Sequence, residues 1–174
     1  MNKHGLAISK KISIIALFSI VVFISKIFLP TPLDKMFILI QPLSYAMANF
    51  IIGRLGGTVV GAISGLLVQT WRPVFIPFTF LFALIYGLMI DFFIYLFRIR
   101  SSQRTVSSLR LMFALSLASI IVGVSAMYVT VGAGVMPAAY QIYIMVLIAG
   151  TLNGLVAGYL IAQIWNRYLG KRIT

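Results

Sequence analysis

Long apolar runs, separated by short segments that hold most of the charges, are the feature that most constrains this chain. A helix needs about 20 mostly apolar residues to cross a bilayer. Six apolar runs are present, at residues 12–29, 36–52, 58–70, 74–97, 109–131 and 138–165. We therefore predict an all-α fold, in which residues 1–174 form a single transmembrane domain with six helices in a compact bundle.

The second and third runs are shorter than most of the others, and only Arg54 and glycines separate them. They fit two short helices that cross the membrane, and they also fit one broken, re-entrant pair. Non-helical backbone is tolerated at membrane depth only where protein or a water-filled cavity covers it. The sequence is compatible with both arrangements.

The composition indicates that lipid surrounds these runs. Of the 174 residues, 61% are hydrophobic and 9% are charged, whereas a soluble domain is about half apolar and about a quarter charged. So few charged residues could not cover the surface of a soluble fold of this size.

The basic residues are unevenly divided between the two sides that six spans would create. Three of them fall on the side away from the termini: Lys26, Lys35 and Arg72. The others fall on the side of the termini: Lys3, Lys10, Lys11, Arg54, Arg98, Arg100, Arg104, Arg110, Arg167, Lys171 and Arg172. Because Lys and Arg are enriched in cytoplasmic loops, we expect a multi-pass cell-membrane protein with both termini in the cytoplasm.

The net charge of +12 raises the question of nucleic-acid binding, but the basic residues lie at the ends of apolar runs and do not form one hydrophilic face. We expect them to contact lipid headgroups instead. The chain has no cysteine and one histidine, His4. We therefore expect no metal site, no catalytic residues and no cofactor, and we do not expect an enzyme.

Asp91 is the one acidic residue inside an apolar run. Burying an ionisable group in a membrane is costly, so such a residue is a candidate for function. Near the end of its run, it would reach water or pair with Arg54 or with a basic residue of the next loop. Two interpretations stay open: a structural ion pair or partner contact, and a role in transport.

Polar and aromatic residues gather at the run ends on the side away from the termini. Trp and Tyr at this depth are often interfacial anchors, but amides and aromatics from several loops also suit a small-molecule pocket. The residues that we expect to bind a substrate are Lys35, Gln69, Trp71, Arg72, Tyr128 and Gln141. The basic residues Lys26, Lys35 and Arg72 would favour a ligand with an anionic group.

Glycines recur every fourth position in two of the runs. They are Gly57, Gly61 and Gly65 in the third run, and Gly150, Gly154 and Gly158 in the sixth. This spacing places small residues on one helix face and lets helix backbones approach closely. We expect packing within the bundle, whereas a glycine face that stayed exposed would dock a partner helix.

Three segments carry a resemblance to a known family. They are the small-residue segment 13–19, the proline-broken segment 29–32, and the glycine-rich segment 52–67. With the six spans, the short loops and the lack of a nucleotide-binding motif, the chain resembles the S component of energy-coupling factor (ECF) vitamin transporters. The S component is the substrate-binding membrane subunit of these importers.

The resemblance implies that the chain captures a vitamin or related small molecule on the outer face and works with a transmembrane coupling subunit and two ATPase subunits. ATP hydrolysis would topple the subunit so that its pocket opens inward. Small residues of the first helix face the coupling subunit in that family, and Ser13, Ala16 and Ser19 would take this place here. The metal-binding branch of the family uses an N-terminal histidine motif that His4 does not match.

Three other functions remain in competition. A non-transporting assembly or anchoring subunit would use the glycine faces as its interface and would bind no small molecule. A small self-sufficient carrier or channel is a further alternative, although no inverted repeat is visible between the two halves of the chain. A membrane enzyme would lose its activity on substitution of Asp91 by Asn.

Overall fold

The computed structural model describes residues 8–28, 39–71, 77–99, 105–134 and 140–170. Within them the chain forms six α-helices, which confirms the prediction of an all-α fold. The helices are α1 (Ile8–Phe28), α3 (Ile40–Ile52), α4 (Gly56–Trp71), α5 (Phe78–Leu96), α6 (Ser108–Gly132) and α7 (Tyr140–Ile164), and α7 continues into a single π-helical turn, η2 (Trp165–Leu169).

Four of these segments are long and apolar enough to cross a membrane, namely α1, α5, α6 and the continuous α7–η2 segment. The chain is therefore a multi-pass membrane protein. The remaining helices are shorter, with 13 residues in α3 and 16 in α4. At about 1.5 Å per residue, α3 is about 20 Å long, and a crossing by α3 and α4 stays a prediction.

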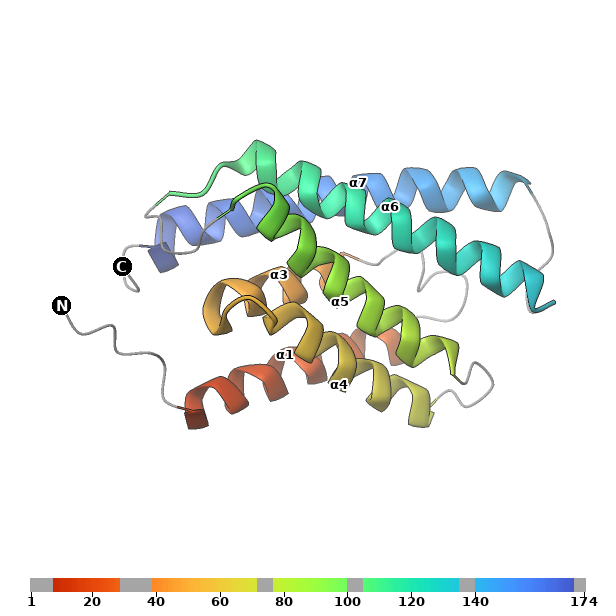
Figure 1. The fold of residues 1–174 in the computed structure, drawn as a ribbon, viewed down its shortest axis with the longest axis horizontal. Helices are drawn as coiled ribbons and strands as arrows, with labels where there is room; N and C mark the ends of the chain where they lie inside the picture. Colours follow the sequence, from red (N-terminus) through yellow and green to blue (C-terminus); the bar gives the residue numbers. More distant parts are fainter. Residues whose placement is uncertain (1–7, 29–38, 72–76, 100–104, 135–139, 171–174) are drawn as a thin grey trace.

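Figure 1 shows how the helices are arranged. Helices α6 and α7 run side by side along one edge of the molecule, α1 lies at the other edge, and the short α3 lies between them. Helix α4 packs against α1, α3 and α5, and α5 joins this group to α6. The start of α1 and the end of η2 lie at the same end of the bundle, which we call the terminal end.

Glycines permit the closest helix contacts. A Cβ atom on Gly154 or Gly158 would collide with the α6 backbone at Ser116 or Met112, and a Cβ atom on Gly61 would lie 2.5 Å from the carbonyl oxygen of Ala83 on α5. Helices that approach this closely gain contact area that larger side chains would prevent. The prediction that the glycine stripes pack inside the bundle is confirmed at these positions.

The terminal end of α7 is fixed to two other parts of the chain. Trp165 is fully buried, and its ring packs edge-on against Phe50 of α3 at 5.1 Å between centroids. The next side chain, Asn166, accepts a hydrogen bond from the Val106 N–H (2.7 Å) and donates one to the Val106 carbonyl (3.0 Å). The π-helical turn thereby ties α7 to the segment that precedes α6.

Candidate functional site

A buried polar network joins three helices near the terminal end, and Asp91 of α5 is its centre. The side chain is 4% exposed. Its Oδ1 accepts hydrogen bonds from the Asn49 side-chain amide of α3 (2.7 Å) and from the Gly57 N–H of α4 (3.1 Å). Its Oδ2 accepts two more, from the N–H and the hydroxyl of Thr58, both at 2.7 Å.

The carboxylate of Asp91 therefore caps the start of α4. The first N–H groups of a helix have no partner within the helix and need an acceptor from elsewhere. Leu55, which precedes α4, has no side-chain oxygen to supply one. A carboxylate also suits this place because a helix N-terminus carries partial positive charge.

The backbone of α4 must come close for this contact to form. A Cβ atom on Gly57 would lie 2.5 Å from Asp91 Oδ1 and 3.0 Å from the Tyr45 carbonyl oxygen. Gly87, one turn before Asp91, faces the Gly57 carbonyl oxygen just as closely. Glycine at both positions lets α4 and α5 approach until the N–H groups reach the carboxylate.

The partners of Asp91 differ from the basic partner considered from the sequence. Arg54 follows α3, but its guanidinium carbon lies 5.7 Å from the ring centroid of Tyr95. The link from Arg54 to the network is its carbonyl oxygen, which accepts a hydrogen bond from the Asn49 amide (3.2 Å). Four neutral donors therefore hold the Asp91 carboxylate. These hydrogen bonds connect α5 with α3 and α4, which is the geometry of a structural contact between helices.

Two tyrosines in the middle of the bundle are also held through their hydroxyls. Tyr45 and Tyr86 pack edge to face at 5.6 Å between ring centroids. Tyr45 bonds to Ser64 of α4 at 3.2 Å, and Tyr86 bonds to Ser119 of α6 at 2.6 Å. These pairs satisfy hydroxyls that would otherwise be costly to bury, and they connect α3 with α4 and α5 with α6.

Other buried polar atoms lack such partners. Ser19 Oγ of α1, Gln41 Nε2 of α3 and Gln69 Oε1 of α4 make no hydrogen bond with the described part of the chain. Ser19 is 1% exposed and Gln41 is 6% exposed, and the three helices pack against one another. A buried polar group without a partner costs about 1–3 kcal/mol, so each of these atoms would gain from a hydrogen bond to a bound molecule.

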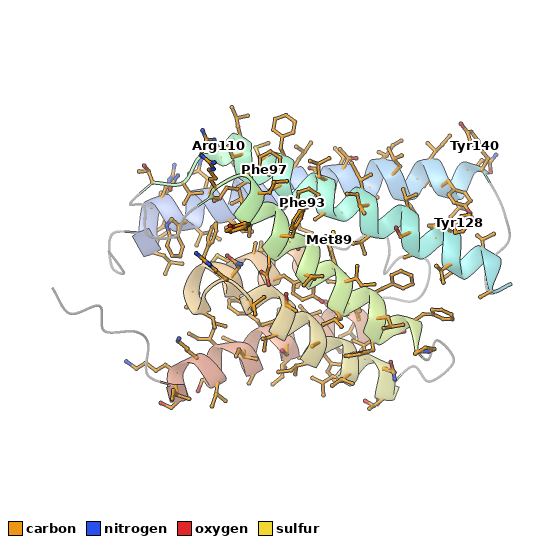
Figure 2. All side chains as sticks on the ribbon, viewed as in Figure 1. Met89, Phe93, Phe97, Arg110, Tyr128 and Tyr140 are labelled. Atoms are coloured by element: carbon orange, nitrogen blue, oxygen red, sulfur yellow. The ribbon has the colours of Figure 1, made fainter. Side chains whose placement is uncertain are left out.

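Of the residues expected to bind a substrate that the structure describes, Gln69 alone has such a buried, unpaired atom. Trp71, Tyr128 and Gln141 are exposed. Figure 2 shows Tyr128 of α6 close to the end of the bundle opposite the terminal end, where Tyr140 begins α7. The described residues thus place these candidates at one end of the molecule, and Lys35 and Arg72 lie outside the described residues.

The residues expected to face a coupling subunit divide between two sides of α1. Ser13 and Ala16 are exposed, whereas Ser19 is buried. Helix α1 as a whole buries only Ser19 and Val22. Its exposed side is therefore available to lipid or to another protein, and it includes Ser13 and Ala16 but not Ser19.

The sequence did not indicate that Asn49, Gly57 and Thr58 would be the partners of Asp91. The glycine pair before Thr58 was a usable signal, because a helix that begins without a capping side chain in apolar surroundings needs an acceptor from another segment. Comparisons of the chain with known protein families, with curated proteins and with solved structures find no match. A functional proposal therefore depends on these residues alone.

Proposed function

We propose that this chain is the substrate-binding subunit, or S component, of an ECF-type importer that takes up a vitamin or a related small molecule. In this proposal all six helices cross the membrane and the termini are cytoplasmic. The end of the bundle opposite the terminal end then faces outward and binds the substrate. A transmembrane coupling subunit and two ATPases supply the driving force.

The unpaired polar atoms of Ser19, Gln41 and Gln69 are the observation that carries the proposal. They offer a hydroxyl, an amide N–H donor and a carbonyl acceptor within three packed helices that consist mainly of apolar residues. Binding sites for small molecules combine apolar walls with a few polar groups that fix the orientation of the ligand. A substrate that carries both donors and acceptors would compensate for the cost of burying these atoms.

The charge distribution supports the proposed orientation. Lys10 lies near the start of α1, Arg98 just after α5, Arg110 near the start of α6 and Arg167 in η2, so all four fall at the terminal end. Basic residues are enriched on the cytoplasmic side of membrane proteins. The opposite end of the bundle, where α4 ends two residues after Gln69, then faces outward.

The exposed side of α1 supports a contact with a coupling subunit. Ser13 and Ala16 make part of this side smooth, and a partner helix packs closely on small residues. Ser19 would act instead inside the bundle, beside the substrate site. In this proposal Ser13 and Ala16 contact the coupling subunit, whereas Ser19 lies beside the substrate site.

Equilibrium binding to the purified protein tests the proposal. We expect saturable binding of one compound from a panel of vitamins, and we expect Gln41→Leu to weaken it about five- to thirtyfold, the effect of losing about one to two kcal/mol of hydrogen bonding. Gln163→Leu is the matched control, because Gln163 near the terminal end already bonds to Tyr159 (3.1 Å). Equal weakening by both substitutions, or no binding at all, would reject the assignment.

A non-transporting assembly subunit is the second candidate, because the exposed side of α1 would also suit a permanent partner. Such a subunit needs no ligand, so its unpaired polar atoms would form hydrogen bonds with water or with the partner protein. Co-purification with one stoichiometric membrane partner, in the absence of any vitamin binding, would favour this alternative.

A further inference from the structure

Two arginines lie where the turn between α3 and α4 meets the end of α5: Arg54 in the turn and Arg98 just after α5. We call this pair the cationic corner. The cation–π contact with Tyr95 holds the Arg54 guanidinium, and the Asn49 amide holds the Arg54 carbonyl oxygen. An aromatic ring attracts the face of a guanidinium group and leaves the N–H donors at its edges available for an anion. Arg54 is thus positioned before any ligand binds.

Arg98 is a second exposed arginine at the same end of α5, three residues after Tyr95. It follows the last turn of α5, and its N–H donates to the Tyr95 carbonyl oxygen at 3.0 Å. Its φ angle is 53°, a left-handed conformation that glycine usually adopts at helix ends and that is unfavourable for residues with a Cβ atom. The positive charge of a basic residue is favourable at a helix C-terminus. This electrostatic effect does not explain why Arg98 has a left-handed backbone.

The chain offers these arginines little internal counter-charge. It has fourteen Lys and Arg residues and two acidic ones. Asp91 is buried, and four donors already occupy its carboxylate. Asp34, the other acidic residue, lies outside the described residues. Among the described residues, therefore, no carboxylate is available to these arginines.

The surface next to the arginines is apolar. Leu55, Phe92, Tyr95 and Leu96 are each more than half exposed, although all four lie in or beside the last turns of α5 and the start of α4. An occupant that matches both features needs an anionic head and an apolar body. An acidic protein would match the charges only, whereas a phospholipid matches both.

We propose that Arg54 and Arg98 bind the phosphate of an anionic phospholipid, with an acyl chain along Leu55, Phe92 and Leu96. Arginine suits this role because its planar donors match phosphate oxygens, and basic sites at helix ends select anionic headgroups. The inference requires only that the chain is a multi-pass membrane protein, and it does not depend on the proposed transport function.

Native mass spectrometry of the detergent-purified full chain tests this site. With equal amounts of phosphatidylglycerol and phosphatidylcholine, we expect the first lipid adduct to be mainly phosphatidylglycerol. Arg54→Gln should reduce that preference about fivefold, the effect of one basic residue at an anionic surface. Arg167→Gln, which removes an exposed arginine elsewhere at the terminal end, should leave the preference unchanged.

Arg98→Gly provides an independent test, because it removes the charge and relieves the backbone strain together. We expect a higher melting temperature than wild type in lipid-free detergent and a smaller stabilisation by phosphatidylglycerol. Equal preference for the two lipids in wild type, or the same loss with Arg167→Gln, would overturn the proposal. Stabilisation by inorganic phosphate as strong as that by phosphatidylglycerol would also overturn it, since the acyl chain would then contribute nothing.

Discussion

The carboxylate of Asp91 accepts hydrogen bonds from both the N–H and the hydroxyl of Thr58, so α5 caps the first turn of α4. In a soluble protein water would satisfy the N–H groups at such a helix start. In lipid each unsatisfied backbone group is much more costly. This pair therefore explains why one acidic residue is retained in the apolar segment of α5.

Substitution Asp91→Asn should destabilise the protein by about 2–3 kcal/mol, because an amide NH₂ cannot accept the hydrogen bonds that one carboxylate oxygen accepts now. The free energy of unfolding, measured by SDS titration in mixed micelles, checks this. A variant with wild-type stability that has lost substrate uptake would instead show a direct role of Asp91 in transport.

Substitution Thr58→Val separates the hydroxyl from the backbone N–H. It keeps the shape of the side chain and removes one bond to a charged acceptor, so we expect a loss of about 1.5 kcal/mol in the same titration. The matched control is Thr70→Val, because the Thr70 hydroxyl is bonded to the Leu67 carbonyl of its own helix. Equal effects at the two positions would mean that the contact with Asp91 adds no stability.

Glycine substitutions along α7 should follow the contacts of each position. Gly154→Ala should destabilise the α6–α7 pair by about 1–3 kcal/mol, because its Cβ atom would overlap the Ser116 backbone. Gly150→Ala should be tolerated, since its Cβ atom would lie 3.5 Å from the Ser119 carbonyl oxygen. Thermal unfolding of both variants tests the order, and a larger loss at Gly150 would contradict the helix packing.

Substitution Gln41→Leu should increase stability while it weakens ligand binding. In the unliganded protein it removes a buried amide that has an unpaired N–H, so we expect a gain of about 1 kcal/mol. Opposite signs for stability and function are typical of residues retained for binding. A melting temperature below that of wild type would indicate that the Gln41 amide has a structural partner.

The number of helices could be predicted from the sequence, because each helix coincides with one long apolar run. The starts of α3 and α5 could not be placed well, although their ends were placed to within one residue. The second run was expected at 36–52 and the fourth at 74–97, whereas α3 begins at Ile40 and α5 begins at Phe78. Hydropathy reports which residues prefer lipid, but it does not report where the backbone becomes helical.

The partners of Asp91 could not be predicted for a different reason. Thr58 and Asp91 lie 33 residues apart, and the sequence does not contain the crossing of α4 and α5 that joins them. The charge pattern favoured a basic partner, yet Arg54 packs on Tyr95. The split of Ser13 and Ser19 between two sides of α1 likewise depends on which side of the helix meets α3 and α4.

Native mass spectrometry of the protein purified without added ligand tests the central claim most directly. The proposal predicts a bound small molecule of vitamin size in wild type, displaced by the matching vitamin and present at lower occupancy in Gln41→Leu. It also predicts that Gln163→Leu retains the molecule. A wild-type protein that carries no such molecule, and acquires none from a panel of vitamins, would contradict a substrate-binding subunit.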